Sequence, residues 1–255
     1  MSSRSGRAVG FLILAAAIRL CGQSSAAPYK PPRTPDGKPD LQGIWEVRSP
    51  AASGNLEAHS ASAGIRAGES VIVDPPDGKI PYLPAAAAKQ RENFAKRATA
   101  DPVSKCYLPG VPRITYMPYP FQIFQTPNFM AMTYEYVHAS RTVYMNGSKH
   151  LDGIDFWMGD SRGHWEDETL VIDVADNNAA TWVDSSGNYH SDALHVVERY
   201  TRTSPNTMQY EAIIEDPKVF ARPWKIRLPL FRHDEKGAQL YEYECHVYLE
   251  EQSRK

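Results

Sequence analysis

Residues 193–216 read ALHVVERYTRTSPNTMQYEAIIED, and this stretch carries the pattern that decides the fold. Two runs rich in β-branched and aromatic side chains alternate apolar with polar residues, and a polar turn separates them. Such runs are typical of half-buried strands, and a polar turn between them predicts a β-hairpin. The stretch therefore predicts two antiparallel strands.

The same pattern extends in both directions along the chain. Residues 163–176 (GHWEDETLVIDVAD) and 224–249 (WKIRLPLFRHDEKGAQLYEYECHVYL) predict two further hairpins, the second turning at 234–237. Shorter strand-like runs come earlier, at residues 41–47, 70–74, 121–126, 129–138 and 141–147. About ten strands at this close spacing indicate a mainly β fold, built as a single antiparallel meander.

A meander of this size has to hide its two edge strands, either by closing into a barrel or by pairing as a β-sandwich. Gly43 and Trp45, on the first predicted strand, resemble the Gly-x-Trp signature of lipocalin-type barrels. The resemblance implies that the glycine makes room for the chain, that the tryptophan closes the floor, and that a cavity holds one small ligand. We therefore expect a lipocalin-like barrel, with a β-sandwich as the alternative.

The N-terminal half differs from the strand-rich half. Residues 84–97 (PAAAAKQRENFAKR) start with proline and continue with alanines and mixed charges, which predicts one helix with Pro84 at its first position. Residues 27–40 are a proline-rich leader that we expect to be extended and poorly ordered. Residues 41–255 are long enough for a single barrel-like domain.

Residues 1–26 have the three parts of a secretory signal peptide. Arg4 and Arg7 precede the apolar stretch 8–18, which is shorter than the roughly 20 apolar residues that a bilayer needs. Ser24 and Ala26 supply the small-x-small pattern of a cleavage site. We therefore expect an exported protein, periplasmic or secreted, with no membrane insertion after cleavage.

Charge and cysteine content narrow the class of protein further. The formal net charge is −2, and the predicted signal removes arginines but no acids, so neither nucleic acid nor an anionic membrane is an expected partner. Cys21 leaves with the signal, and the two cysteines that remain in an exported chain favour one disulfide, Cys106 to Cys245. A pair of free thiols is the alternative. The sequence predicts no particular oligomeric state.

Histidines of the second half are the candidate catalytic groups, because imidazole exchanges protons near neutral pH. His195 lies on the strand that begins at residue 194, and His190 with Asp192 forms a candidate imidazole–carboxylate pair at its entrance. Alternation along 129–138 places His138 on one strand face with Tyr136.

Residues 157–165 (WMGDSRGHW) are polar between two tryptophans, and glycines loosen their backbone. This composition suits the mouth of a binding site with aromatic walls and a few oriented polar groups. The alternative is a well-bonded turn in which Asp160 caps backbone amides and pairs with Arg162.

These observations favour an exported small-molecule enzyme that works without an organic cofactor, by acid–base chemistry of the isomerase, cyclase, lyase or hydrolase type, on a small, partly apolar molecule in a barrel cavity. The expected catalytic residues are His138, His190, Asp192, His195 and Asp160. The expected substrate-binding residues are Tyr136, Arg141, Trp157, Arg162, Trp165, Trp182 and Arg199. No GxSxG or dinucleotide-binding motif is present.

Two alternatives to the enzyme remain open. One is a non-catalytic protein that binds a small ligand in the same cavity. The other is a metal protein in which His138, His190 and His195 hold a divalent ion, although the chain has neither an HExxH motif nor paired CxxC motifs.

Several blocks of the sequence resemble a widespread set of exported bacterial proteins of uncharacterised function. These blocks are 101–113 (DPVSKCYLPGVPR), 119–127 (YPFQIFQTP), 134–141 (YEYVHASR), 157–173 (WMGDSRGHWEDETLVID), 190–200 (HSDALHVVERY) and 216–224 (DPKVFARPW). The resemblance implies export and a shared fold but no particular reaction. In that set the last block usually runs Cys-His-Glu-Gly-Asn, whereas Val247 and Tyr248 follow Cys245-His246 here, so the acid after the histidine is missing.

Overall fold

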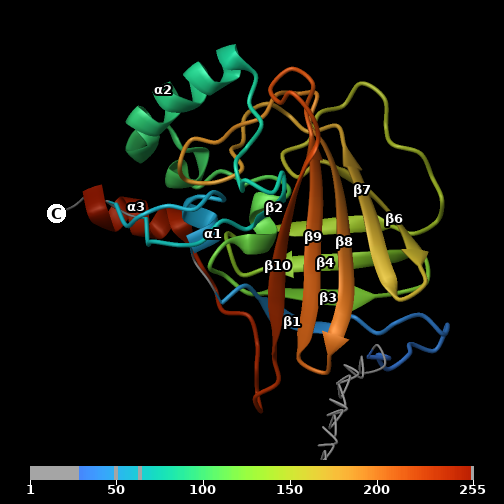
Figure 1. Ribbon diagram of the computed structural model, residues 1–255. Coiled ribbons are helices and arrows are strands. Elements are labelled where there is room, and N and C mark those ends of the chain that lie inside the picture. Colours follow the sequence, from blue (N-terminus) through green and yellow to red (C-terminus); the bar gives the residue numbers. More distant parts are fainter. Residues whose placement is uncertain (1–28, 49–50, 63–64, 254–255) are drawn as a thin grey trace, which may run out of the picture.

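The computed structural model describes residues 29–48, 51–62 and 65–253, and its centre is a β-barrel with helices gathered on one side (Figure 1). The strands are β1 (Gly43–Glu46), β2 (Ile72–Asp74), β3 (Phe121–Gln125), β4 (Phe129–Tyr134), β5 (Ser140–Tyr144), β6 (Asp160–Glu166), β7 (Thr169–Ala175), β8 (His195–Ser204), β9 (Thr207–Glu215) and β10 (Trp224–His233). The helices are α1 (Ala51–Gly54), α2 (Pro84–Ala100) and α3 (Cys245–Ser253), with 3₁₀ turns at Pro102–Lys105 and Arg113–Tyr116. The predicted signal peptide lies outside the described residues.

The barrel closes because its first and last strands pair. The order of neighbours is β1-β3-β4-β5-β6-β7-β8-β9-β10, and β1 also pairs with β10, with Ile44 opposite His233. The remaining strand, β2, lies beside the first part of β10, with Asp74 opposite Lys225. β1 and β2 therefore share one edge of β10. The predicted mainly β barrel is confirmed.

One pair of neighbours departs from the predicted antiparallel meander. β5 and β6 are parallel, with Val143 opposite Ser161, because the connection 145–159 returns the chain to the end at which β5 began. Close packing there requires glycine at position 163. A Cβ atom on Gly163 would lie 2.4 Å from Met145 Sδ and 2.8 Å from Val143 Cγ1.

The predicted hairpin over residues 224–249 is wrong in its second half. β10 ends at His233, and residues 245–253 form the helix α3. A returning strand would need a free edge on β10, but β9 occupies one edge and β1 and β2 occupy the other. The chain instead leaves the barrel, and the predicted disulfide between Cys106 and Cys245 fixes the start of α3, with 5.5 Å between the two Cα atoms.

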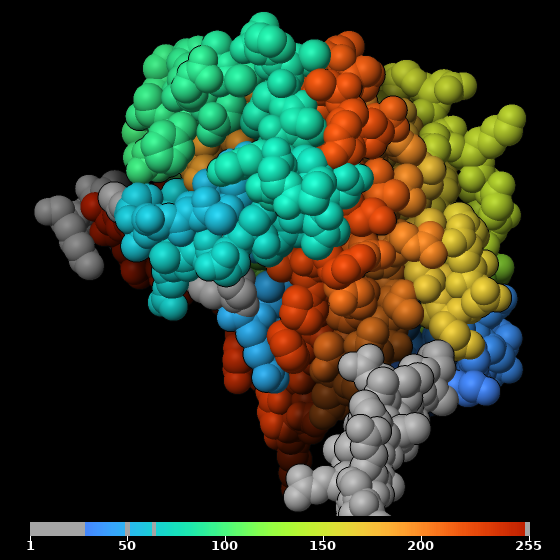
Figure 2. Space-filling view, in the orientation of Figure 1, coloured from blue at the N-terminus to red at the C-terminus, as the bar shows by residue number. Residues whose placement is uncertain are grey.

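The predicted helix is confirmed as α2, with Pro84 in its first turn. Figure 2 shows this helix and the loop before it as one mass beside the barrel, and Gln90 and Asn93 of the helix donate to the carbonyl oxygens of Ser186 and Gly187. The described part of the leader, residues 29–40, is not simply extended. Gly37 N donates to Thr34 O at 2.8 Å, and Gln125 Nε2 on β3 donates to Pro39 O at 3.0 Å, so a tight turn is held against the barrel. Among the described residues no helix is long and apolar enough to span a membrane.

Large side chains fill the barrel interior, so the expected ligand cavity is occupied by the protein itself. Alternate residues of β8, β9 and β10 point inward and are buried, including Tyr200, Tyr210 and Trp224. Among them lies a buried ion pair, with Arg141 Nη2 on β5 2.5 Å from Glu198 Oε2 on β8. The hydroxyls of Tyr200 and Tyr210 donate to Glu198 Oε1 at 3.1 and 2.8 Å, so the carboxylate is fully bonded.

Gly43 and Trp45 are both closely packed on β1. Trp45 is fully buried, and its Nε1 donates to Leu41 O at 2.9 Å. Gly43 has a φ of +129°, and a Cβ atom there would lie 2.9 Å from Arg232 Nε. The glycine therefore admits the Arg232 side chain, whose guanidinium carbon lies 5.9 Å from the centre of the Trp45 ring.

Candidate functional site

The first of the three predicted histidines, His138, lies at the surface. β4 ends at Tyr134, and the backbone turns through positive φ angles at Val137 and His138, so the predicted alternation stops before the histidine. The imidazole is half exposed, and its Nε2 lies 2.6 Å from Glu244 Oε1. His138 therefore faces the segment before α3 and does not face the barrel interior.

His190 is sealed inside the protein. It is 2% exposed, its Nε2 lies 2.6 Å from Thr181 Oγ1, and its Nδ1 lies 2.8 Å from Ser191 O. Burial lowers the pKa of His190, which favours the neutral ring. The predicted His190–Asp192 pair is not formed, because Asp192 is exposed and binds Lys218 Nζ at 2.6 Å, an ion pair that lowers the pKa of Asp192.

His195 is the first residue of β8 and points away from the barrel interior, whereas Val196 and Glu198 point inward. Its Nε2 lies 3.0 Å from Asp173 Oδ1 on β7. The three histidines thus have separate surroundings, and the expectation that they line one cavity or hold one metal ion together is wrong.

The predicted binding residues are dispersed as well. Arg141 lies inside the barrel, and Trp182 is buried. Tyr136 packs against Tyr119 and Tyr243, Trp157 stacks on Tyr107, and Trp165 packs half-buried against the core. Arg199 Nη1 lies 2.8 Å from Glu166 Oε2. Arg162 is different, because it lies with Asp160 in a cluster that the sequence predicted only in part.

This cluster lies on the outer side of β6, β7 and β8, beneath the connection 145–159. Strand register builds it, since Arg162 is opposite Asp173 on β7, and Asp173 is opposite Val197 on β8, two residues from His195. We call it the outer-wall cluster, and its members are His150, Asp160, Arg162, Asp173, Asp176 and His195.

Hydrogen bonds link the members in a chain. His150 Nδ1 lies 3.1 Å from Asp160 Oδ2, and His150 Nε2 lies 2.9 Å from Asp173 Oδ1, which His195 also contacts. Arg162 Nη2 donates to Asp160 Oδ2 at 2.7 Å, and the amide of Leu151 donates to the same oxygen at 3.2 Å. The predicted bonding of Asp160, to Arg162 and to a backbone amide, is therefore confirmed.

Asp176 follows β7 with a φ of +56°, and its carboxylate, like the guanidinium of Arg162 at Nε, has an unmet bonding capacity. Its Oδ2 is buried and has no hydrogen-bond partner among the described residues. Burial raises the pKa of Asp176; His150 opposes this shift, and the charges of Asp160, Asp152 and Asp155 reinforce it. Carboxylates outnumber cationic side chains in the outer-wall cluster, so its negative charge favours a bound cation.

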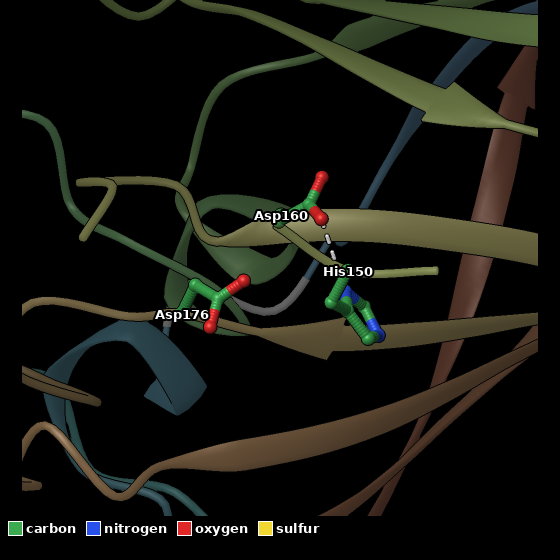
Figure 3. A group of neighbouring side chains, drawn as sticks. All are labelled: His150, Asp160 and Asp176. Atoms are coloured by element: carbon green, nitrogen blue, oxygen red, sulfur yellow. Dashed lines mark hydrogen bonds and ion pairs between the residues drawn. The ribbon is translucent and has the colours of Figure 1, made fainter. Parts of the chain in front are cut away.

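His150, Asp160 and Asp176 are placed to share one ion. Each offers a ligand atom, and these atoms all lie within 4.8 Å of one another. Figure 3 shows the two carboxylates and the imidazole around a common space, each arriving from a different segment. His150 and Asp176 could not be predicted as members of the cluster, because both lie in irregular segments, where strand alternation says nothing about neighbours.

The ring nitrogens of His150 decide between two states of this cluster. If Nε2 carries the proton that bonds Asp173, Nδ1 presents a lone pair to the carboxylate of Asp160, and two acceptors face each other at 3.1 Å. A metal ion between them removes the conflict. A doubly protonated imidazolium, bonded to both carboxylates, removes it as well.

Comparison of the chain with protein-family models, with curated proteins and with solved structures finds no match. A functional proposal therefore has to come from the geometry.

Proposed function

We propose that this protein is an exported metal-dependent enzyme whose centre is a divalent transition-metal ion held by His150 Nδ1 and by carboxylate oxygens of Asp160 and Asp176. One observation carries the proposal: ligand atoms of His150, Asp160 and Asp176 all lie within 4.8 Å of one another, while His150 Nε2 lies 2.9 Å from Asp173 Oδ1. Metal-binding histidines commonly donate their second ring N–H to a carboxylate, which fixes the tautomer and orients the ring.

The donor set points to the class of ion. Imidazole suits zinc, iron, copper and nickel, whereas carboxylates alone suit magnesium and calcium, so a mixed set of one nitrogen and two oxygens favours Zn²⁺ or a similar ion. The protein supplies three ligands, as catalytic zinc sites do, and further positions stay open for water or substrate. The unpartnered Oδ2 of Asp176 gains a partner when the ion binds.

Acid–base chemistry remains the proposed reaction type, now at the outer wall. A divalent ion held by these residues would supply a bound water that loses a proton near neutral pH, and His195, whose Nε2 lies 3.0 Å from the shared Asp173, would accept that proton. Isomerase, cyclase, lyase and hydrolase reactions all use such groups. The Cys106–Cys245 disulfide and the predicted signal peptide support the proposal of export.

To test the proposal, the protein is first treated with a chelator and is then titrated with zinc. We expect one equivalent of Zn²⁺ to bind in isothermal titration, and His150→Ala and Asp176→Asn each to weaken binding at least tenfold. The matched control is His164→Ala, which removes an exposed imidazole from β6, the strand that carries Asp160, and should leave zinc binding unchanged.

Two results would overturn the metal centre. One is the absence of stoichiometric zinc binding, in which case the imidazolium state of His150 accounts for the cluster. The other is binding that persists undiminished in folded His150→Ala and Asp176→Asn, which would locate the ion elsewhere.

A further inference from the structure

A second site lies away from the outer-wall cluster and shares no residue with it. It is a cavity of about 200 Å³, which we call the tyrosine cavity, lined mainly by Arg113, Met117, Tyr119, Tyr136, Ser185 and Tyr243. These residues come from the 3₁₀ turn at Arg113–Tyr116, the segment before β3, the turn after β4, the loop before β8 and the segment before α3. Parts of the chain that are distant in sequence thus meet around one space.

Three aromatic rings form the apolar wall. The ring centres of Tyr119 and Tyr243 lie 4.5 Å apart, those of Tyr119 and Tyr136 lie 5.4 Å apart, and those of Tyr136 and Tyr243 lie 5.5 Å apart. The Tyr136 hydroxyl is anchored by the carbonyl oxygens of Val103 and Tyr107, both at 3.3 Å. Clustered rings of this kind favour a planar, unsaturated guest that can stack or meet them edge to face.

Arg113 supplies the polar group. Its side chain is 2% exposed, and Nη1 and Nη2 donate to the two carboxylate oxygens of Asp101 at 2.8 and 2.7 Å. Nη2 also donates to Ser185 Oγ at 2.8 Å. Nε, by contrast, is buried without a hydrogen-bond partner among the described residues. A buried N–H donor left unpaired costs free energy, which an acceptor atom of a guest would recover.

Charge and size restrict the guest. Arg113 is the charged residue that lines the cavity, and the two-pronged ion pair with Asp101 already balances it, so an anion gains little there. Burial, followed by the hydrogen bond to Tyr243, raises the pKa of Tyr119, so its hydroxyl keeps its proton. The volume is below the roughly 300–1,000 Å³ of pockets that hold drug-sized ligands, so a single ring is the right size.

We propose that the tyrosine cavity binds a small, neutral, single-ring aromatic molecule whose carbonyl oxygen accepts a hydrogen bond from Arg113 Nε. The rings of Tyr119, Tyr136 and Tyr243 bind the aromatic ring, and the donor orients the oxygen. The disulfide helps to hold the site together, because Cys245 lies two residues after Tyr243.

Acetophenone is the probe for this proposal, and benzoate, its anionic counterpart, is the comparison ligand. We expect saturable binding of acetophenone to the intact oxidised protein by ligand-observed NMR, at least fivefold tighter than benzoate. Tyr243→Leu should weaken acetophenone binding at least fivefold. Tyr241→Leu is the matched control, because Tyr241 is 70% exposed and lies outside the cavity, and it should bind as the wild type does.

Arg113→Lys tests the polar group, since lysine keeps the charge beside Asp101 but lacks the Nε donor. In this variant acetophenone binding should weaken at least fivefold, whereas zinc binding should be unchanged. If that variant fails to fold, Tyr243→Leu alone decides. The proposal is overturned if acetophenone does not bind saturably, if benzoate binds as tightly, or if folded Tyr243→Leu and Tyr241→Leu bind acetophenone equally.

Discussion

At the scale of single residues, His190 illustrates a histidine that serves the fold. Both ring nitrogens are bonded inside the protein, and burial lowers the pKa of His190. The unfolded chain therefore takes up a proton at this histidine at a higher pH than the folded chain does. Stability that is present at neutral pH is lost as the pH falls through the ordinary histidine pKa near 6.5.

We expect His190→Gln to lower the free energy of unfolding at pH 7 by about 1–3 kcal/mol, because buried partners lose their bonds. The gap between variant and wild type should narrow at pH 5, since glutamine binds no proton on unfolding. Urea unfolding at both pH values measures this. A gap of equal size at the two pH values would contradict it, and His164→Gln, with an exposed imidazole, should show little effect at either pH.

Arg141 and Glu198 form a buried ion pair that is costly to break. Both side chains are buried inside the barrel, so removing one charge leaves the other without compensation. We expect Glu198→Gln to lower the free energy of unfolding by about 3–5 kcal/mol. The exposed pair Arg199–Glu166 is the matched comparison, and Glu166→Gln should lower the free energy of unfolding far less than Glu198→Gln does. Chemical denaturation of the two variants compares them, and similar losses would refute the argument.

At the scale of elements, α3 depends on a covalent bond. Apart from Cys245 its described side chains are exposed, and a helix of nine residues is marginal in water on its own. The disulfide joins residues 139 apart in sequence, which corresponds to about 5 kcal/mol in the loop-entropy model.

Replacement of both Cys106 and Cys245 by serine should therefore lower stability by up to about 5 kcal/mol. Amide hydrogen exchange should become fast throughout α3 while β8 and β9 stay protected. The single variant Val247→Ser, at an exposed position of α3, serves as a control that keeps the disulfide. Protection of α3 that survives loss of the disulfide would show that packing, and not the bond, holds the helix.

Elements made by local pairing could be predicted from the sequence, and those decided by distant partners could not. The hairpins β6–β7 and β8–β9 need only their own alternation and a turn. The predicted hairpin after β10 does not form, because β1 and β2 occupy the edge that a returning strand would need. The parallel pairing of β5 with β6 likewise depended on the path of a long connection.

The candidate site follows the same division. Asp160 and Arg162 are two apart on one strand, so their shared face and their contact could be predicted. His150 joins them only because the connection 145–159 folds back over β6 and β7, and no periodicity marks that path. Likewise, alternation along β8 puts His195 and Glu198 on opposite sides of the strand, but it does not say which side becomes the interior.

At the scale of the whole molecule, metal binding should stabilise the fold in a pH-dependent way. An ion at 100 times its dissociation constant adds about 2.7 kcal/mol to the free energy of unfolding. The ligands bind metal only when deprotonated, and the raised pKa of Asp176 means that this carboxylate takes up its proton at a higher pH than an ordinary aspartate.

We therefore expect Zn²⁺ to raise the melting temperature at pH 7 and to lose most of this effect by pH 5. Differential scanning calorimetry with and without the ion measures it. Asp176→Asn, which binds zinc more weakly, should show a smaller zinc-dependent shift than the wild type at pH 7. An undiminished shift at pH 5 would mean that these ligands do not hold the ion.

The seam between β1 and β10 joins the start of the barrel sequence to its end. A growing or truncated chain that stops before Trp224 would leave both β1 and β9 with exposed rows of backbone donors and acceptors. Such fragments would each expose two unpaired strand edges and would tend to associate through them into open-ended assemblies. Completion of a single late strand is thus what separates a self-contained molecule from a polymerising one.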